Sequence, residues 1–138
     1  MHDMNEFNRS VIEEFRAHGG KVAGAYAQMP LLLLTTTGAR SGETRTTPVV
    51  YLSDGERLIV FASKAGAPEN PSWYYNLLAN PSVTVEVGSD TLELEAVELE
   101  GEERQRLFER QAELHPQFSE YAQRTARTIP VIALQPRG

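Results

Sequence analysis

The sequence predicts a mainly β (α+β) fold, a closed or split barrel of about six antiparallel strands with flanking helices. Most apolar runs are short and end at Gly, Pro, Asn or Asp, which is typical of strands joined by turns. The regular alternation of strand and helix that builds a parallel sheet is absent. The strand expected at 91–100 changes its apolar phase between Leu94 and Val97, which is typical of a β-bulge that bends a strand around a barrel.

The first expected element is an amphipathic helix at 3–18, because Phe7, Val11 and Phe15 recur at a spacing of four and two glycines end the pattern. We expect this N-terminal helix, residues 1–20, to pack on a single barrel domain formed by residues 21–138. A flap on the substrate side or at a membrane surface is the alternative. Only two of the helix's six charged residues are basic, so anionic lipid would attract it weakly.

A β-meander is expected next. The run 31–37 is bounded by proline and glycine and is too short for a helix, so it is expected to be a buried strand. Two further strands, at 46–52 and 58–62, are joined by a Ser-Asp-Gly-Glu turn.

A loop at 63–71, containing two prolines and a glycine, is expected to lead into a short helix at 73–79. Asn70 or Ser72 is placed to cap the first turn of that helix, since a side-chain oxygen there accepts a bond from a free backbone N–H. An Asn-Pro pair then ends the helix.

The second half of the chain is expected to complete the barrel. Alternating valines predict a strand at 83–87, and a Gly-Ser-Asp turn leads into the strand at 91–100. A helix at 102–114 begins with acidic residues, as the helix dipole favours, and a second short helix ends near Ala126. The last strand is expected at 129–135.

The composition excludes several classes of protein. A net charge of −6 argues against nucleic-acid binding, which needs clustered Lys and Arg. The chain has no cysteine, and its three histidines are not at ligand spacing, so no metal site is expected. The acidic N-terminus lacks a secretory signal, which predicts a cytoplasmic location, with peripheral attachment at the inner face of the membrane as the alternative.

Chemistry-bearing residues are densest at 35–48. The two glycines of this segment allow close backbone approach, and Arg40 and Arg45 supply charge, so the loop suits a phosphate or carboxylate. A hairpin with solvated arginines is the alternative. Ser63-Lys64 adds a cation at a strand end, where barrels bind ligands. Nothing in the sequence indicates a hydrolase, so the chemistry is expected to come from a cofactor.

Several motifs occur together, in an order and at a spacing that identify a family. They are Leu-Thr-Thr-Thr-Gly-x-Arg-Ser-Gly ending at Gly42, Arg45 with Pro48, Ala62-Ser63-Lys64, Pro71-Ser72-Trp73-Tyr74, Asn76-Leu77, Ala79-Asn80-Pro81 and Arg127-Thr128-Ile129-Pro130. With these motifs the chain resembles the deazaflavin (F420)-dependent nitroreductase family from Leu32 to Pro136. The resemblance implies a barrel like the FMN-binding split barrel and an oxidoreductase of the nitroreductase or quinone reductase type. Such an enzyme passes hydride from reduced coenzyme F420 (F420H2) to a small electrophile.

The resemblance also implies cofactor-binding roles, position by position. Arg40, Arg45 and Lys64 would hold the phosphate and the carboxylate-bearing tail, aided by Ser41 and the backbone from Gly38 to Gly42. The residues implied along the deazaflavin or closing over it are Thr47, Pro48, Val49, Phe61, Ala62, Ser63, Trp73 and Asn76.

Tyr121 is the candidate to donate a proton or hydrogen bond to the acceptor, and Phe118 and Tyr121 are expected to shape the substrate pocket. His115 is a second candidate donor, because imidazole titrates near neutral pH. Family members that reduce nitro compounds tend to carry tyrosines at the positions of His115 and Phe118. A quinone or another conjugated electrophile is therefore at least as good an expected acceptor as a nitro compound.

Two alternatives remain open at this point. An FMN-dependent oxidoreductase on the same barrel would grip one terminal phosphate, whereas three cations spread along a groove suit the longer tail of F420. A non-catalytic carrier of F420 or of a lipid-like ligand would bind without turnover. Monomer and homodimer are both compatible with the sequence.

Overall fold

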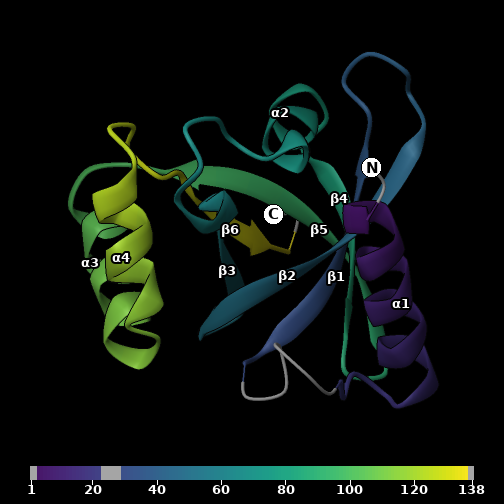
Figure 1. Ribbon diagram of the computed structural model, residues 1–138. Helices are drawn as coiled ribbons and strands as arrows, with labels where there is room; N and C mark the ends of the chain where they lie inside the picture. Colours follow the sequence, from purple (N-terminus) through teal and green to yellow (C-terminus); the bar gives the residue numbers. More distant parts are fainter. Residues whose placement is uncertain (1–2, 23–28, 137–138) are drawn as a thin grey trace.

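A computed structural model describes residues 3–22 and 29–136, and six strands within them close into one antiparallel barrel (Figure 1). The order around the barrel is β1-β2-β3-β6-β5-β4, and β4 pairs with β1. The strands are β1 (Leu31–Thr37), β2 (Thr44–Asp54), β3 (Arg57–Phe61), β4 (Ser82–Val87), β5 (Asp90–Leu99) and β6 (Val131–Gln135). The helices are α1 (Asp3–Ala17), α2 (Ser72–Ala79), α3 (Gly101–Leu114) and α4 (Gln117–Arg124), with a 3₁₀ turn η2 (Lys64–Gly66). The predicted fold class is confirmed.

The apolar run of β1 is buried on both faces. Side chains alternate across a strand, so Leu32 and Leu34 face the barrel interior, while Leu31 and Leu33 pack with the apolar face of α1. All four leucines are at most 6% exposed. A helix covering the outside of the strand therefore explains why this strand is continuously apolar and not alternating.

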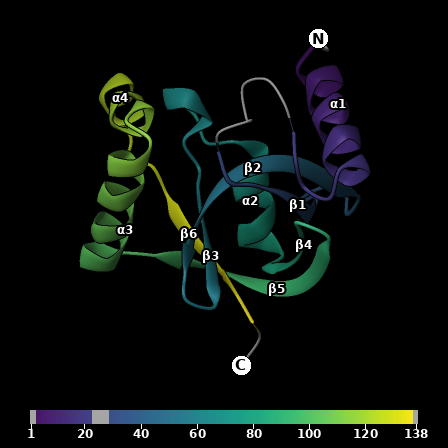
Figure 2. The same ribbon diagram turned by 90° about the horizontal axis from the view of Figure 1, so that it is seen from below.

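A second apolar layer lies outside the barrel, under α3 and α4. Ile59 and Phe61 of β3 and Val131 of β6 turn outward there and pack with Leu107 of α3. Figures 1 and 2 show α3 and α4 together on one side of the barrel and α1 on the other. The two helical layers thus flank the strands between them.

Helix α2 packs on the interior of the barrel. Trp73 and Leu77 belong to the same buried cluster as Leu32, Val60 and Leu134. Only 8% of Trp73 is exposed.

The β-bulge predicted in β5 is not observed. The ladders of β5 with β4 and with β6 each run without an inserted residue. The phase change has another cause: Leu94 packs in the barrel interior, and Leu99 packs in the layer under α3. The first part of β5 thus buries its apolar side chains in the barrel interior, and its last part buries them on the opposite face, under α3.

The predicted capping of α2 is also wrong. The N-cap residue is Pro71, and no side chain bonds to the first turn. The Asn70 amide oxygen instead accepts a hydrogen bond from Arg127 Nη1 at 2.6 Å. The loop predicted at 63–71 contains the turn η2, which the sequence did not indicate.

Candidate functional site

A cavity of about 490 Å³ lies where β2, the end of β3, α2 and α4 meet. This volume is within the range of sites for small organic ligands, roughly 300–1,000 Å³. The residues around it are Asn8, Met29, Arg45, Thr47, Pro48, Val49, Val50, Phe61, Ser63, Lys64, Pro71, Ser72, Trp73, Phe118 and Tyr121. Ten of them carry a role predicted from the sequence, and the fifteen together come from six separate stretches of the chain.

Aromatic rings form one wall of the cavity. Phe118 packs edge-on against Phe61, with ring centroids 5.7 Å apart, and against Tyr121 at 5.1 Å. Phe61 in turn packs edge-on against the buried Phe108 of α3 at 6.1 Å. Contacts of this geometry hold rings in fixed orientations. The wall that carries Tyr121 is therefore anchored in the core under α3.

Two cations lie at the cavity. Arg45 is exposed and makes no ion pair within the described part of the chain. Lys64 is 46% exposed at its side chain, and its Nζ lies 3.1 Å from Glu69 Oε1. A cavity with an apolar floor and cations beside it fits a flat ring system with an anionic tail.

Lys64 has an unusual backbone conformation. Its φ is +46°, and no other non-glycine residue of the described chain has a positive φ. L-residues seldom adopt this left-handed region, and such residues concentrate at functional sites. The strand end that carries the second cation is therefore held in a specific shape.

The hairpin loop between β1 and β2 uses most of its own backbone donors. Gly38 N donates to Glu43 O at 2.7 Å and Gly42 N to Gly38 O at 3.1 Å, while the Ser41 hydroxyl accepts from Glu43 N at 3.1 Å. Ala39 N donates to Asn76 Oδ1 at 3.0 Å. Anion binding here would thus depend on side chains more than on these amides.

Asn76 links α2 to this loop. Besides accepting from Ala39 N, it donates from Nδ2 to Thr36 Oγ1 at 3.1 Å, and only 9% of the residue is exposed. The amide was expected at the deazaflavin, but in this structure both its polar atoms hold the hairpin.

The structure divides the predicted site residues into two groups. Those at the cavity are Arg45, Thr47, Pro48, Val49, Phe61, Ser63, Lys64, Trp73, Phe118 and Tyr121. Those that do not line it are Gly38, Arg40, Ser41, Gly42, Ala62, Asn76 and His115. His115 stands at the end of α3, where its backbone N donates to Gln111 O at 2.8 Å.

Five lining residues were not predicted. Val50, Pro71 and Ser72 adjoin predicted positions, so their neighbours along the chain were a usable signal. Asn8 of α1 and Met29 come from a distant part of the sequence and carry no local signal of this role.

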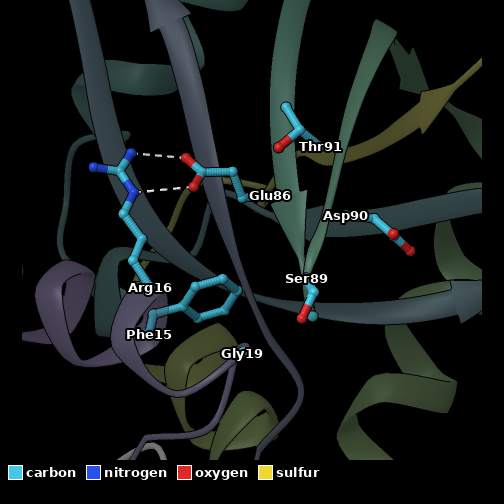
Figure 3. Close-up of a pocket in the computed structure, with 8 residues that line it drawn as sticks. Phe15, Arg16, Gly19, Glu86, Ser89, Asp90 and Thr91 are labelled. Atoms are coloured by element: carbon cyan, nitrogen blue, oxygen red, sulfur yellow. Dashed lines mark hydrogen bonds and ion pairs between the residues drawn. The ribbon is translucent and has the colours of Figure 1, made fainter.

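A second cavity, of about 190 Å³, lies between α1 and the turn from β4 to β5. Figure 3 shows the Arg16 guanidinium facing the Glu86 carboxylate, with bonds of 2.9 and 2.8 Å. The hydrogen bond to Glu86 raises the pKa of Arg16. This ion pair attaches α1 to the barrel. Because the Arg16 guanidinium is already paired in two bonds, the cavity offers less to an anionic ligand.

Within residues 3–22 and 29–136, no three His, Asp or Glu side chains gather as metal ligands. No helix in the same ranges has the length and apolar character needed to cross a bilayer.

Fold and site together define a class, the split β-barrel proteins with a ligand-sized cavity beside the barrel. The same fold occurs in proteins with other ligands: a haem storage protein of Vibrio cholerae is 18% identical, with a TM-score of 0.62 over 92% of this chain and 88% of its own. Fold alone therefore does not decide the ligand.

Closer relatives decide the family. The model of the F420H(2)-dependent quinone reductase family matches residues 7–136. An F420H(2)-dependent quinone reductase of Mycobacterium tuberculosis is 38% identical over 122 residues, which cover 86% of this chain and 80% of the relative. The solved structure of an F420-H2 dependent reductase (FDR-A) is 42% identical, with a TM-score of 0.71, and the match covers 77% of this chain and 94% of that one.

The chain belongs to the F420H(2)-dependent quinone reductase family. The predictions of an F420-dependent oxidoreductase and of its cofactor are thereby confirmed. A further solved structure, titled a domain-swapped dimer, is 37% identical, with a TM-score of 0.73 over 95% of this chain and 98% of its own.

Proposed function

We propose that the 490 Å³ cavity binds reduced F420 and that the chain catalyses hydride transfer from it to a quinone. The observation that carries this proposal is the placement of Arg45 and Lys64 beside an apolar cavity with an aromatic wall. When bound, reduced F420 would supply a hydride from a ring carbon of its deazaflavin and leave as oxidised F420. The protein's own task is to bind, orient and exclude water, with no protein nucleophile.

We assign the binding of the cofactor to two kinds of residue. Arg45 and Lys64 would attract the phosphate and the carboxylates of the tail through charge-assisted hydrogen bonds. Pro48 and Val49 on β2, both buried, would offer an apolar surface to the ring. Arg40, exposed on the hairpin and outside the cavity, would act on the more distant part of the tail.

Tyr121 is our candidate for the group that assists the acceptor. Its ring lies at the cavity and packs against Phe118, and its phenol makes no hydrogen bond among the described residues. A phenol can donate a hydrogen bond to an oxygen that gains negative charge. His115 does not line the cavity, so Tyr121 is the stronger of the two predicted donors.

The aromatic wall also supports the choice of acceptor class. Phe118 and Phe61 both line the cavity, and aromatic rings pack well against a flat conjugated molecule. A quinone has this shape and two oxygens able to accept from Tyr121. A nitroaromatic has a similar shape and remains a secondary acceptor, which the family name does not include.

Equilibrium titration of the purified protein with F420 and separately with FMN tests the cofactor assignment. Arg45→Ala is expected to weaken F420 binding about tenfold, as the loss of one exposed charge-assisted bond would. Arg106→Ala, which removes an exposed arginine from α3, is the matched control and should leave affinity unchanged. Tighter binding of FMN than of F420 would contradict the proposal.

Stopped-flow oxidation of the bound reduced cofactor tests turnover. Menadione is expected to oxidise it faster than a nitroaromatic does, and Tyr121→Phe should slow the menadione reaction at least about tenfold. Tyr75→Phe, a change at a half-exposed tyrosine outside the cavity, is the control. F420 binding without oxidation by any acceptor would favour a carrier.

The same purified protein can be used to test its oligomeric state and its attachment to membranes. The 37% identical structure titled a domain-swapped dimer supports a homodimer for this chain. A particle mass near twice 15.4 kDa in light scattering would agree with it, and a mass near 15.4 kDa would indicate a monomer. Co-sedimentation with anionic vesicles tests the predicted weak contact with the inner face of the membrane against a purely cytoplasmic location.

A further inference from the structure

The Arg127 side chain donates hydrogen bonds to several backbone carbonyls of the segment that carries Lys64. Its Nη2 donates to Ser63 O at 2.8 Å, its Nη1 to Ala62 O at 3.1 Å and its Nε to Ala67 O at 3.0 Å. Nη1 also donates to Asn70 Oδ1. One side chain therefore holds residues on both sides of Lys64. These residues lie about 60 positions from Arg127 in the sequence.

The bonded loop is the one with the unusual backbone. Lys64 follows Ser63 directly and has a φ of +46°. Two turn bonds, Gly66 N to Ser63 O at 2.9 Å and Ala67 N to Lys64 O at 3.0 Å, complete η2. Since an L-residue seldom adopts this conformation unaided, surrounding contacts must hold it. The Arg127 bonds to the peptide carbonyls of Ala62, Ser63 and Ala67 are contacts of this kind.

The turn is also packed against the helix of the aromatic wall. Gly66 lies so close to α4 that a Cβ built on it would stand 2.9 Å from Tyr121 O. Displacing η2 would therefore affect both the cation and the helix that carries Tyr121.

We propose that Arg127 is a positioning residue that fixes Lys64 at the cavity in a conformation ready to bind the cofactor's anionic tail. This inference rests on the proposed function. Arg127 does not line the cavity and would not touch the cofactor. It acts through the backbone of the turn: with the backbone fixed, the lysine loses less conformational freedom when it binds its anion.

An arginine is suited to this role by its shape. Its guanidinium carries five N–H donors in a rigid plane, and the structure uses three of its nitrogens on four acceptors. A lysine keeps the charge but places three donors around a single nitrogen, so it cannot span Ala62 O and Ala67 O together in the same way. Arg127→Lys therefore removes the fork and retains the charge.

A purely structural role is the competing explanation, and the chain offers a control for it. Arg104 also donates from two nitrogens to a backbone carbonyl, Ile129 O, at 3.2 and 2.7 Å, and it stands over the Phe108 ring. Among the described residues, it makes no hydrogen bond or ion pair with the turn at Lys64. Arg104→Lys should lower stability without any specific effect on the cofactor.

A double-mutant cycle in F420 affinity separates the two explanations. Arg127→Lys is expected to weaken F420 binding about tenfold in the wild-type background and less than about twofold in the Lys64→Met background, because residues that act as a unit are not additive. Arg104→Lys should change affinity less than about twofold in both. Equal losses from Arg127→Lys in both backgrounds, or no loss in either, would overturn the inference.

Amide hydrogen exchange tests the same inference without any ligand. In Arg127→Lys, the Gly66 and Ala67 amides should exchange at least about tenfold faster, while in Arg104→Lys they should not change. Unchanged exchange in Arg127→Lys would refute the positioning role. Failure of the wild-type protein to bind F420 would instead refute the proposed function, so the two failures are distinguishable.

Discussion

Replacing Asn76 with alanine tests whether this residue stabilises the hairpin loop or serves the ligand. Its amide connects α2 to both the loop and β1, through Ala39 N at 3.0 Å and Thr36 Oγ1 at 3.1 Å. The partners lie about 40 positions away in the sequence, so the bonds exist only in the folded chain. Asn76→Ala removes both bonds and leaves Ala39 N and Thr36 Oγ1 without them.

The expected cost can be worked out from these two bonds. Each net hydrogen bond contributes about 1 kcal/mol, and leaving a buried partner unsatisfied costs about 1–3 kcal/mol, so a loss of about 2–4 kcal/mol is expected. For 138 residues, an unfolding entropy of about 2.1 cal/mol/K per residue gives about 0.29 kcal/mol/K. The melting temperature should then fall by about 7–14 °C.

Thermal unfolding followed by circular dichroism measures this fall. Leu78→Ala, at a 51% exposed position of the same helix, is the control and should shift the melting temperature by less than about 2 °C. A melting temperature for Asn76→Ala within that same range would show that the two bonds do not hold the hairpin. A normal melting temperature with lost F420 affinity would return Asn76 to the ligand site.

Three further changes probe other parts of the structure. Burial, with a hydrogen bond to Glu98, raises the pKa of Tyr74 from 10.0 to about 12. The folded state then holds more protons than the unfolded state between these values, so the free energy of unfolding should fall as pH rises through this range. Thermal unfolding at several pH values should show a smaller fall for Tyr74→Phe than for the wild-type protein. Gly66→Ala, at φ +82° with its Cβ 2.9 Å from Tyr121 O, should cost about 1–3 kcal/mol in urea unfolding, and an unchanged midpoint would contradict that packing. Gln111 is 0% exposed, and neither its side-chain N nor O has a partner in the described chain, so Gln111→Leu should raise the melting temperature; a decrease would indicate a polar partner.

The fold could be predicted because its signals are local. Alternating apolar residues and turn residues place each strand, and the observed strands of the barrel begin and end within about three residues of the expected ones. The β-bulge prediction failed because of a second layer of packing. Leu99 follows an apolar phase set by α3 and not by a bulge, and α3 could not be placed against that strand from sequence alone.

The site was predicted only in part, for a related reason. Residue type suggested that Asn70, Asn76 and Arg127 matter, but an amide or a guanidinium bonds equally well to a ligand and to the chain. In the structure the Asn76 amide bonds to the hairpin. Asn70 was expected to cap α2, but its side-chain oxygen accepts a hydrogen bond from Arg127. Such choices depend on long-range partners, whereas Arg45 lies at the start of β2 and Lys64 just after the end of β3, and both line the cavity.

The most direct test of hydride transfer at the 490 Å³ cavity is a single-turnover measurement with reduced F420 deuterated at the hydride-donating ring carbon. The protein is mixed with this cofactor and menadione, and the oxidation rate is compared with that of the unlabelled cofactor. A rate that depends on menadione and falls on deuteration, and that Arg45→Ala reduces at subsaturating cofactor, is the predicted result. Tight F420 binding with no menadione-dependent oxidation would contradict it.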